Sequence, residues 1–308
     1  MKYSIHKIIT FFLIAALATI TFGQFIPAQA ATEKKNSVGE KEHFAGKSPY
    51  RGSYSNMVDN ASRREVRKAL ITAGISKKTV DAWLGDVKNY NKTIGNVSLV
   101  KKGFKAFGKN NPQYNEAAIT TRWTKKYNMF IGYNCRITAY NLMKDFIKVG
   151  NNAKGDSSQL FMDRDALKYS PSVKFTKKQT KTFENIFSSV KTKDTTNVKK
   201  HLSIWQNTWR KNKVSFSKKT KAAMISVVLH SRFSKTDNEL FVGHTGVLVP
   251  LSNKKLLFVE KLSFELPYQA VKFDNRKQLN NYLMGMYDTE WGQKTAKPFI
   301  LEDAKLMN

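Results

Sequence analysis

The chain has 308 residues, a formal net charge of +30 and one cysteine. A single thiol excludes an internal disulfide, and 53 basic against 23 acidic residues favour contact with polyanions. No zinc finger, RNP-type aromatic strand or other nucleic-acid module is recognisable, so a specific nucleic-acid partner is not predicted.

Residues 1–30 have the pattern of a signal peptide. Lys2 and Lys7 form a charged region before an apolar run from Ile8 to Phe22, and Ala28-Gln29-Ala30 is a small-x-small cleavage site. The apolar run is short for a membrane span, and no second candidate follows it. We therefore expect a secreted, extracellular protein of 308 − 30 = 278 residues, without a transmembrane segment after cleavage. Its positive charge favours retention at the cell surface.

The mature chain is expected to contain a disordered basic lead-in, 31–52, and a single α+β domain, 53–308. Helical periodicity predominates in 53–215, whereas 216–308 is expected to hold a small antiparallel sheet and a last helix. Residues 151–172 are predicted to be a loop. The expected helices are a segment opened by the capping box Ser62-Arg63-Arg64-Glu65, then Ser76–Tyr90, Asn115–Lys126, a segment starting near Cys135, Phe175–Val190, Asn197–Lys211 and Arg276–Tyr287.

Three apolar runs in the C-terminal part predict an antiparallel meander. They cover Ala222–Leu229, Leu240–Val249 and Leu256–Phe264, and the polar segment Pro250–Lys255 joins the second to the third. This order of helices first and strands later is typical of an α+β fold and not of alternating βαβ units.

Cys135 is expected at the N-terminus of a helix. Gly132 and Asn134 precede it, and the helical pattern continues to Met143. The positive end of the helix dipole stabilises a thiolate, so this position favours a reactive cysteine. A buried, inert thiol is the alternative.

A nucleophilic cysteine needs a base, and three histidines fall within the predicted domain. His201 lies in a Lys-rich helix and is expected to be solvated, while His230 ends a strand as a core or edge residue. His244 lies in an apolar strand between Gly243 and Gly246, which leave room for a substrate or a neighbouring side chain. We select His244 as the general base, against the alternative of a structural histidine.

Glu260 is the expected third member of the site. If the turn between the second and third strands centres on Ser252, Glu260 pairs directly with His244 and shares its face of the sheet. Its carboxylate would then fix the imidazole tautomer and stabilise the imidazolium. A register slip of one residue would separate the two side chains. The alternative is an exposed partner for Lys254 or Lys261.

The segments Gly132–Arg136 and Gly243–Val249 resemble the two key segments of NlpC-type, papain-like cysteine hydrolases. The resemblance implies a compact papain-like core and a thiol hydrolase or protease activity. It also implies a role for Tyr133 in placing the substrate or the oxyanion, and we group its neighbours Asn134 and Arg136 with it. Those two residues depart from the Asp and Ser that the family commonly has beside its cysteine.

A wider resemblance covers about 54–301. Phe130–Arg136, Leu257–Phe264 and Trp291-Gly292-Gln293 are similar to a family of secreted bacterial proteins defined only as a domain of unknown function. This resemblance implies no activity.

These observations predict a secreted cysteine hydrolase that uses Cys135, His244 and Glu260 on an amide bond, with a cell-wall peptide as the expected substrate. Two alternatives stay open, namely a non-catalytic basic protein that binds the cell surface or wall, and an acyl- or lipid-amide hydrolase on the same scaffold. The expected partner is peptidoglycan or an anionic cell-wall polymer. No metal or cofactor is predicted, because no ligand pair or phosphate-binding glycine loop is present.

Overall fold

The computed structural model describes residues 51–107, 112–252, 254–290, 292 and 294–307. The predicted signal peptide, nearly all of the predicted lead-in, Trp291 and Gln293 lie outside the described residues. Within them the protein is α+β, with eight α-helices and strands that all pair antiparallel. No helix of the described part is long and apolar enough to span a bilayer.

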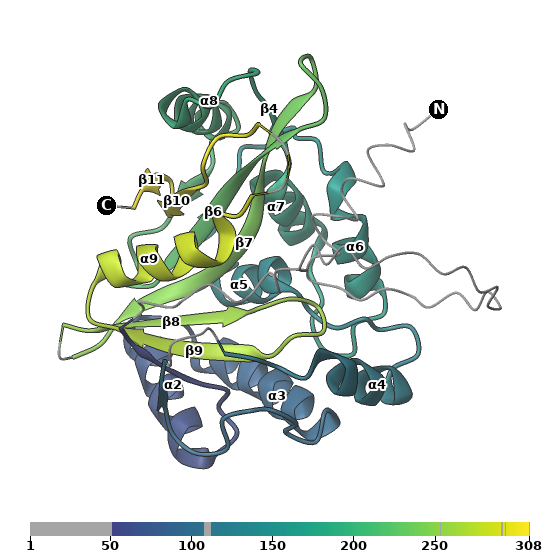
Figure 1. Ribbon diagram of the computed structural model, residues 1–308, viewed down its shortest axis with the longest axis vertical. Coiled ribbons are helices and arrows are strands. Elements are labelled where there is room, and N and C mark those ends of the chain that lie inside the picture. Colours follow the sequence, from purple (N-terminus) through teal and green to yellow (C-terminus); the bar gives the residue numbers. More distant parts are fainter. Residues whose placement is uncertain (1–50, 108–111, 253, 291, 293, 308) are drawn as a thin grey trace, which may run out of the picture.

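A nine-stranded antiparallel sheet forms the centre of the molecule (Figure 1). The predicted meander is confirmed as three adjacent strands, but the sheet is larger than the small one expected, because strands of two to six residues extend it on both sides. The main order is β11 (Lys305–Leu306), β10 (Phe299–Glu302), β6 (Ala223–Arg232), β7 (Asn238–Pro250), β8 (Leu256–Lys261), β9 (Tyr268–Phe273), β1 (Ser53–Ser55) and β2 (Lys105–Ala106).

Two further pairings involve short strands. β4 (Val190–Lys191) pairs with the start of β7, on the edge that β8 uses further along. β3 (Ile147–Lys148) and β5 (Ser215–Phe216) form a separate pair.

The helices begin where polar side chains cap them. In seven of the eight, the N-cap side chain accepts a backbone N–H of the first turn. The helices are α2 (Asn60–Thr72), α3 (Lys77–Thr93), α4 (Glu116–Lys126), α5 (Cys135–Met143), α6 (Phe161–Lys168), α7 (Lys177–Phe187), α8 (Val198–Lys211) and α9 (Arg276–Tyr287).

Two sequence predictions about helices were wrong. The N-cap of the first helix lies three residues earlier than predicted, because Asp59 accepts the Ser62 N–H and Ser62 lies inside the first turn. The segment 151–172 is not only a loop, since it contains a short 3-10 helix, Ser158–Leu160, followed by α6. α6 has only eight residues and no side-chain N-cap, so its sequence signal is weak.

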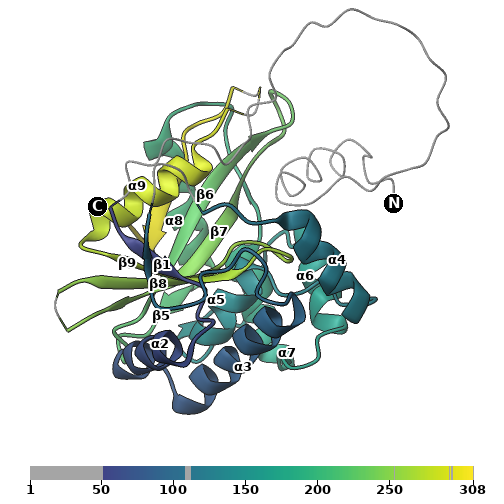
Figure 2. The ribbon, with the colours of Figure 1, turned by 60° about the horizontal axis from the view of Figure 1, so that its bottom comes forward.

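The sheet separates two apolar clusters. One face packs on helices that include α2, α3 and α5, and the other face packs on α9 (Figures 1 and 2). On β8, Leu257 and Val259 belong to the first cluster, whereas Leu256 and Phe258 belong to the second. The period of two along β8 therefore places Glu260 on the α9 face.

Candidate active site

The site lies at a break in the pairing of β7. On the edge shared by β4 and β8, the ladder with β4 ends at Leu240, and that with β8 begins at Gly246. β7 and β8 diverge from their hairpin, and α5 packs against both strands in this opening (Figure 1). The Arg136 side chain, in the first turn of α5, contacts β7 in this opening, because its Nη1 donates to the Val242 carbonyl at 3.3 Å. The break therefore brings Cys135 to β7.

A β-bulge at Gly243 orients the histidine. β6 pairs Val227 with His244 and Val228 with Val242, so Gly243 is the extra residue. Val242 packs in the cluster of α2, α3 and α5, whereas Leu248, beyond the bulge, packs in the cluster of α9. The bulge thus turns His244 to the face that also carries Glu260, a known use of bulges beside functional sites.

His244 and Glu260 are in direct contact. His244 Nε2 lies 2.6 Å from Glu260 Oε2, and the other carboxylate oxygen accepts the Tyr282 hydroxyl at 2.7 Å. The predicted register was wrong by two residues, because β8 pairs Glu260 with Gly246 and places His244 diagonally to it. A register shift of two residues leaves both side chains on the same face of the sheet, so His244 and Glu260 still contact each other.

The thiol and the imidazole form a coupled pair. Burial raises the pKa of Cys135, but its hydrogen bond to His244, the charges of His244 and Arg136, and the Thr245 N–H outweigh burial and lower that pKa overall. Burial lowers the pKa of His244, but its hydrogen bonds to Cys135 and Glu260 outweigh this and raise it to about 9. Both shifts favour a thiolate and an imidazolium.

The three side chains are buried, with Cys135 6% exposed and His244 and Glu260 each 1% exposed. Tyr287, at the end of α9, stacks on the His244 ring with a centroid distance of 4.9 Å and an interplanar angle of 16°. Because Glu260 engages Nε2, Nδ1 is the ring nitrogen left to face the thiol. The arrangement can supply a nucleophile and a proton donor to one reacting group.

The glycines beside His244 are filled by neighbouring side chains. A Cβ on Gly243 would lie 2.3 Å from Leu229 Cδ1, and one on Gly246 would lie 2.4 Å from Phe258 Cζ. The space beside the two glycines is therefore occupied by the side chains of Leu229 and Phe258.

Asn134 and Arg136 are held by Asp163 of α6. Asn134 caps α5 by accepting the Ile137 N–H at 2.9 Å, and its amide donates to Asp163 Oδ1 at 2.8 Å. Arg136 binds both oxygens of this fully buried carboxylate, at 2.9 and 2.7 Å. Removing one partner of such a buried pair costs roughly 3–5 kcal/mol. These contacts orient the cysteine helix.

Tyr133 points to a different segment. Its hydroxyl lies 2.6 Å from Ser170 Oγ and 2.7 Å from Ser172 Oγ, and it accepts the Val173 N–H at 3.1 Å. All these contacts of the Tyr133 hydroxyl are with the 170–173 segment, and they hold the loop before Cys135 against that segment.

A buried lysine supports the same loop from the other side. Lys261 Nζ lies 4.3 Å from the Tyr90 ring centroid and donates to three carbonyls of the β8–β9 turn, those of Ser263, Phe264 and Leu266. The Phe264 carbonyl packs against Gly132, where a Cβ would lie only 2.3 Å from it. Sequence reasoning gave Lys261 no such role.

The other two histidines of the described residues, His201 and His230, contact each other, with ring centroids 4.4 Å apart. The prediction that His201 is solvated was wrong, since it is 0% exposed and bonded to Thr192 and Thr195. Its helix carries Trp205 on the same face, and that spacing of four residues was the available signal.

Sequence reasoning also missed Asp163, Tyr282 and Tyr287. The helix 276–287 was predicted with the observed bounds, but nothing local shows that two of its tyrosines reach the β7–β8 pair. Among the described residues, no group of three or more His, Cys, Asp or Glu could hold a metal ion.

The chain belongs to the family described as a domain of unknown function (DUF4300), whose sequence profile matches residues 53–307. No curated protein and no solved structure matches the chain.

Proposed function

We propose that this protein is a secreted cysteine hydrolase that cleaves an amide bond, with Cys135 as the nucleophile. The observation that carries the proposal is the continuous set of contacts from Cys135 through His244 and Glu260 to Tyr282. Nucleophilic catalysis by cysteine requires a thiol next to a histidine that a carboxylate orients. Here the thiol lies at a helix N-terminus, and the histidine lies buried between the thiol and the carboxylate.

In the proposed reaction the Cys135 thiolate attacks the amide carbonyl carbon. As the first residue of α5, Cys135 has an N–H without a carbonyl partner inside the helix, and in the proposed mechanism this N–H binds the oxyanion. The His244 imidazolium gives its proton to the departing nitrogen as the C–N bond breaks, which leaves a thioester. Neutral His244 then takes a proton from water, and the resulting hydroxide displaces the thiolate and releases the acid.

Chain order supports a relation to NlpC-type, papain-like hydrolases, since a helix-start cysteine is followed by a strand histidine and a polar residue on the next strand. The predicted signal peptide and the charge of +30 favour a peptide of the cell wall as substrate. An acyl- or lipid-amide hydrolase would use the same three residues on a different acyl group.

The proposal is tested by incubating residues 31–308 with peptidoglycan fragments, a free stem peptide and an N-acyl amino acid, and analysing products by mass spectrometry. We expect one amide to be cleaved by wild type and by Met129→Ala, an exposed control, but not by Cys135→Ala or His244→Ala. Which substrate is cleaved distinguishes peptide from lipid amide. Cleavage that persists in Cys135→Ala would overturn the mechanism, and no cleavage of any substrate would favour a non-catalytic surface protein.

A further inference from the structure

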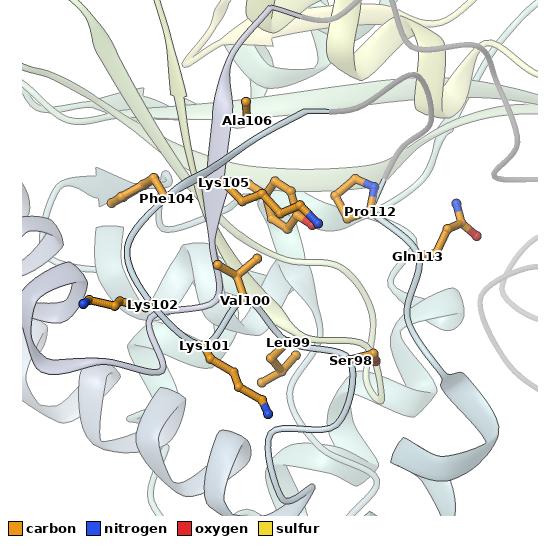
Figure 3. Close-up of a pocket in the computed structure, with 11 residues that line it drawn as sticks. Ser98, Leu99, Val100, Lys101, Lys102, Phe104, Lys105, Ala106, Pro112 and Gln113 are labelled. Atoms are coloured by element: carbon orange, nitrogen blue, oxygen red, sulfur yellow. The ribbon is translucent and has the colours of Figure 1, made fainter.

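A cavity of about 800 Å³ lies beside the loop 98–106, separate from the candidate active site. Lys101, Lys102 and Lys105 line it, and the lining contains no Asp or Glu. Figure 3 shows Lys105 extending toward Pro112 on the opposite side, whereas Lys102 is directed away from Pro112. Among the described residues that line the cavity, all charged side chains are therefore positive.

Lys101, Lys102 and Lys105 are all exposed. Within the described part of the chain, none of the three has a carboxylate at salt-bridge distance. The nearby carboxylate of Asp59 is already used, because it accepts the N–H groups of Ser62 at 2.9 Å and Gly103 at 2.8 Å. Unpaired lysines around a concave surface concentrate anions there.

The loop that carries these lysines is fixed in shape. The Val100 N–H donates to Asn56 Oδ1 at 2.9 Å, and Asn56 is fully buried. Gly103 has a φ of +64°, which turns the chain between Lys102 and Lys105. Lys105 then pairs with Tyr54 as part of β2. A fixed backbone lowers the entropy lost when a ligand binds.

The cavity is also connected to the candidate active site through a row of stacked aromatic rings. Phe107, just after β2, stacks on the cavity residue Tyr54 at 5.4 Å and on Tyr282 at 5.6 Å. Tyr282 in turn donates to Glu260. One aromatic ring thus separates the lysine cavity from the residue that holds the catalytic carboxylate.

We propose that this lysine cavity binds the phosphodiester backbone of an anionic surface polymer. Lysine engages phosphate as a mobile point charge, and several lysines on one loop suit a ligand with repeated phosphates better than a single carboxylate. Because the cavity is close to Tyr282, which donates to Glu260, a polymer bound there would lie near the proposed hydrolase site. The binding itself does not depend on the proposed hydrolysis.

The test measures binding of a fluorescent poly(glycerol phosphate) oligomer to residues 31–308 by anisotropy. Lys101→Gln, Lys102→Gln and Lys105→Gln are combined in one variant. The matched control combines Lys199→Gln, Lys200→Gln and Lys211→Gln, which remove the same charge from exposed positions of α8. Circular dichroism and thermal unfolding verify that both variants are folded.

We expect the cavity variant to bind roughly tenfold or more weakly, since charged hydrogen bonds are lost, and the α8 control to bind nearly as wild type does. Equal losses in the two variants would overturn the proposal, because the binding would then reflect net charge alone. Wild type that binds single-stranded DNA of equal charge as tightly, with the same loss in the cavity variant, would overturn the assignment to a surface polymer.

Discussion

The raised pKa of His244 depends on two contacts of its buried ring, one with Cys135 and one with Glu260. Glu260 engages Nε2 and thereby fixes which nitrogen faces Cys135. Tyr282 and the stacked ring of Tyr287 hold the carboxylate and the imidazole in place. The charge of Glu260 is therefore expected to maintain the imidazolium, and through it the thiolate.

Glu260→Gln tests this dependence with little change of shape. Without the carboxylate charge, the pKa of His244 should fall from about 9 by about one pH unit or more. The measurement is an NMR titration of His244, with His230 as an internal reference. A His244 titration that is unchanged in the variant would show that Glu260 does not stabilise the imidazolium.

The three central residues could be named from the sequence because each carries a local signal: a lone cysteine at a helix start, a glycine-flanked strand histidine, and an acid within an apolar run. Asp163 could not, because its partners Asn134 and Arg136 are 29 and 27 residues away in sequence. Only the folded structure brings the Asp163 carboxylate into contact with the N-terminal end of α5.

At the scale of elements, the site depends on the fit between the loop before α5 and the β8–β9 turn. Gly132 has a φ of +103° and lies against the Phe264 carbonyl. Any side chain there would both strain the backbone and push the turn away from Cys135.

Gly132→Ala should therefore destabilise the protein, by roughly 1–3 kcal/mol from backbone strain alone. Gly85→Ala is the matched control, because Gly85 lies inside α3 with no atom near the added Cβ and should gain about 0.5–1 kcal/mol. Urea unfolding measures both. A Gly132→Ala protein as stable as wild type would contradict the proposed fit.

Sequence periodicity predicted the existence of the seven capped helices and of the strands β6, β7 and β8. It failed for β1, β2, β3, β4, β5, β10 and β11, which have two to four residues, too few for a period of two to be seen. It also missed β9, although that strand has six residues. The gap between β4 and β8, which admits α5, could therefore not be predicted. The exact position of the turn between β7 and β8 could not be predicted either. The predicted pairing of His244 with Glu260 was therefore displaced by two residues.

At the scale of the molecule, the contact between His201 of α8 and His230 of β6 joins α8 to the sheet. His230 accepts the Ala296 N–H at Nδ1, at 2.9 Å, and so is neutral in this arrangement. Burial lowers the pKa of both His201 and His230. Protonation of His230 would break its bond to the segment between α9 and β10.

This pair predicts a loss of stability in acid. Because both folded pKa values lie below the unfolded value of about 6.5, the unfolded chain binds more protons and stability falls as the pH drops through the folded values. His244 has the opposite sign, since its contribution is lost as the pH rises through about 9. Urea midpoints from pH 7.5 down to 5 should decline less in His230→Gln than in wild type; an equal decline would contradict this account.

The most direct test of the central claim is the pH dependence of iodoacetamide alkylation of Cys135, in wild type, His244→Ala and His230→Ala. The account predicts labelling of wild type and His230→Ala near neutral pH, at a pH where His244→Ala is still slow. In His244→Ala the rate should rise only near the ordinary thiol pKa of about 8.5. Identical profiles in wild type and His244→Ala, both rising only above about pH 8, would contradict an activated Cys135–His244 pair.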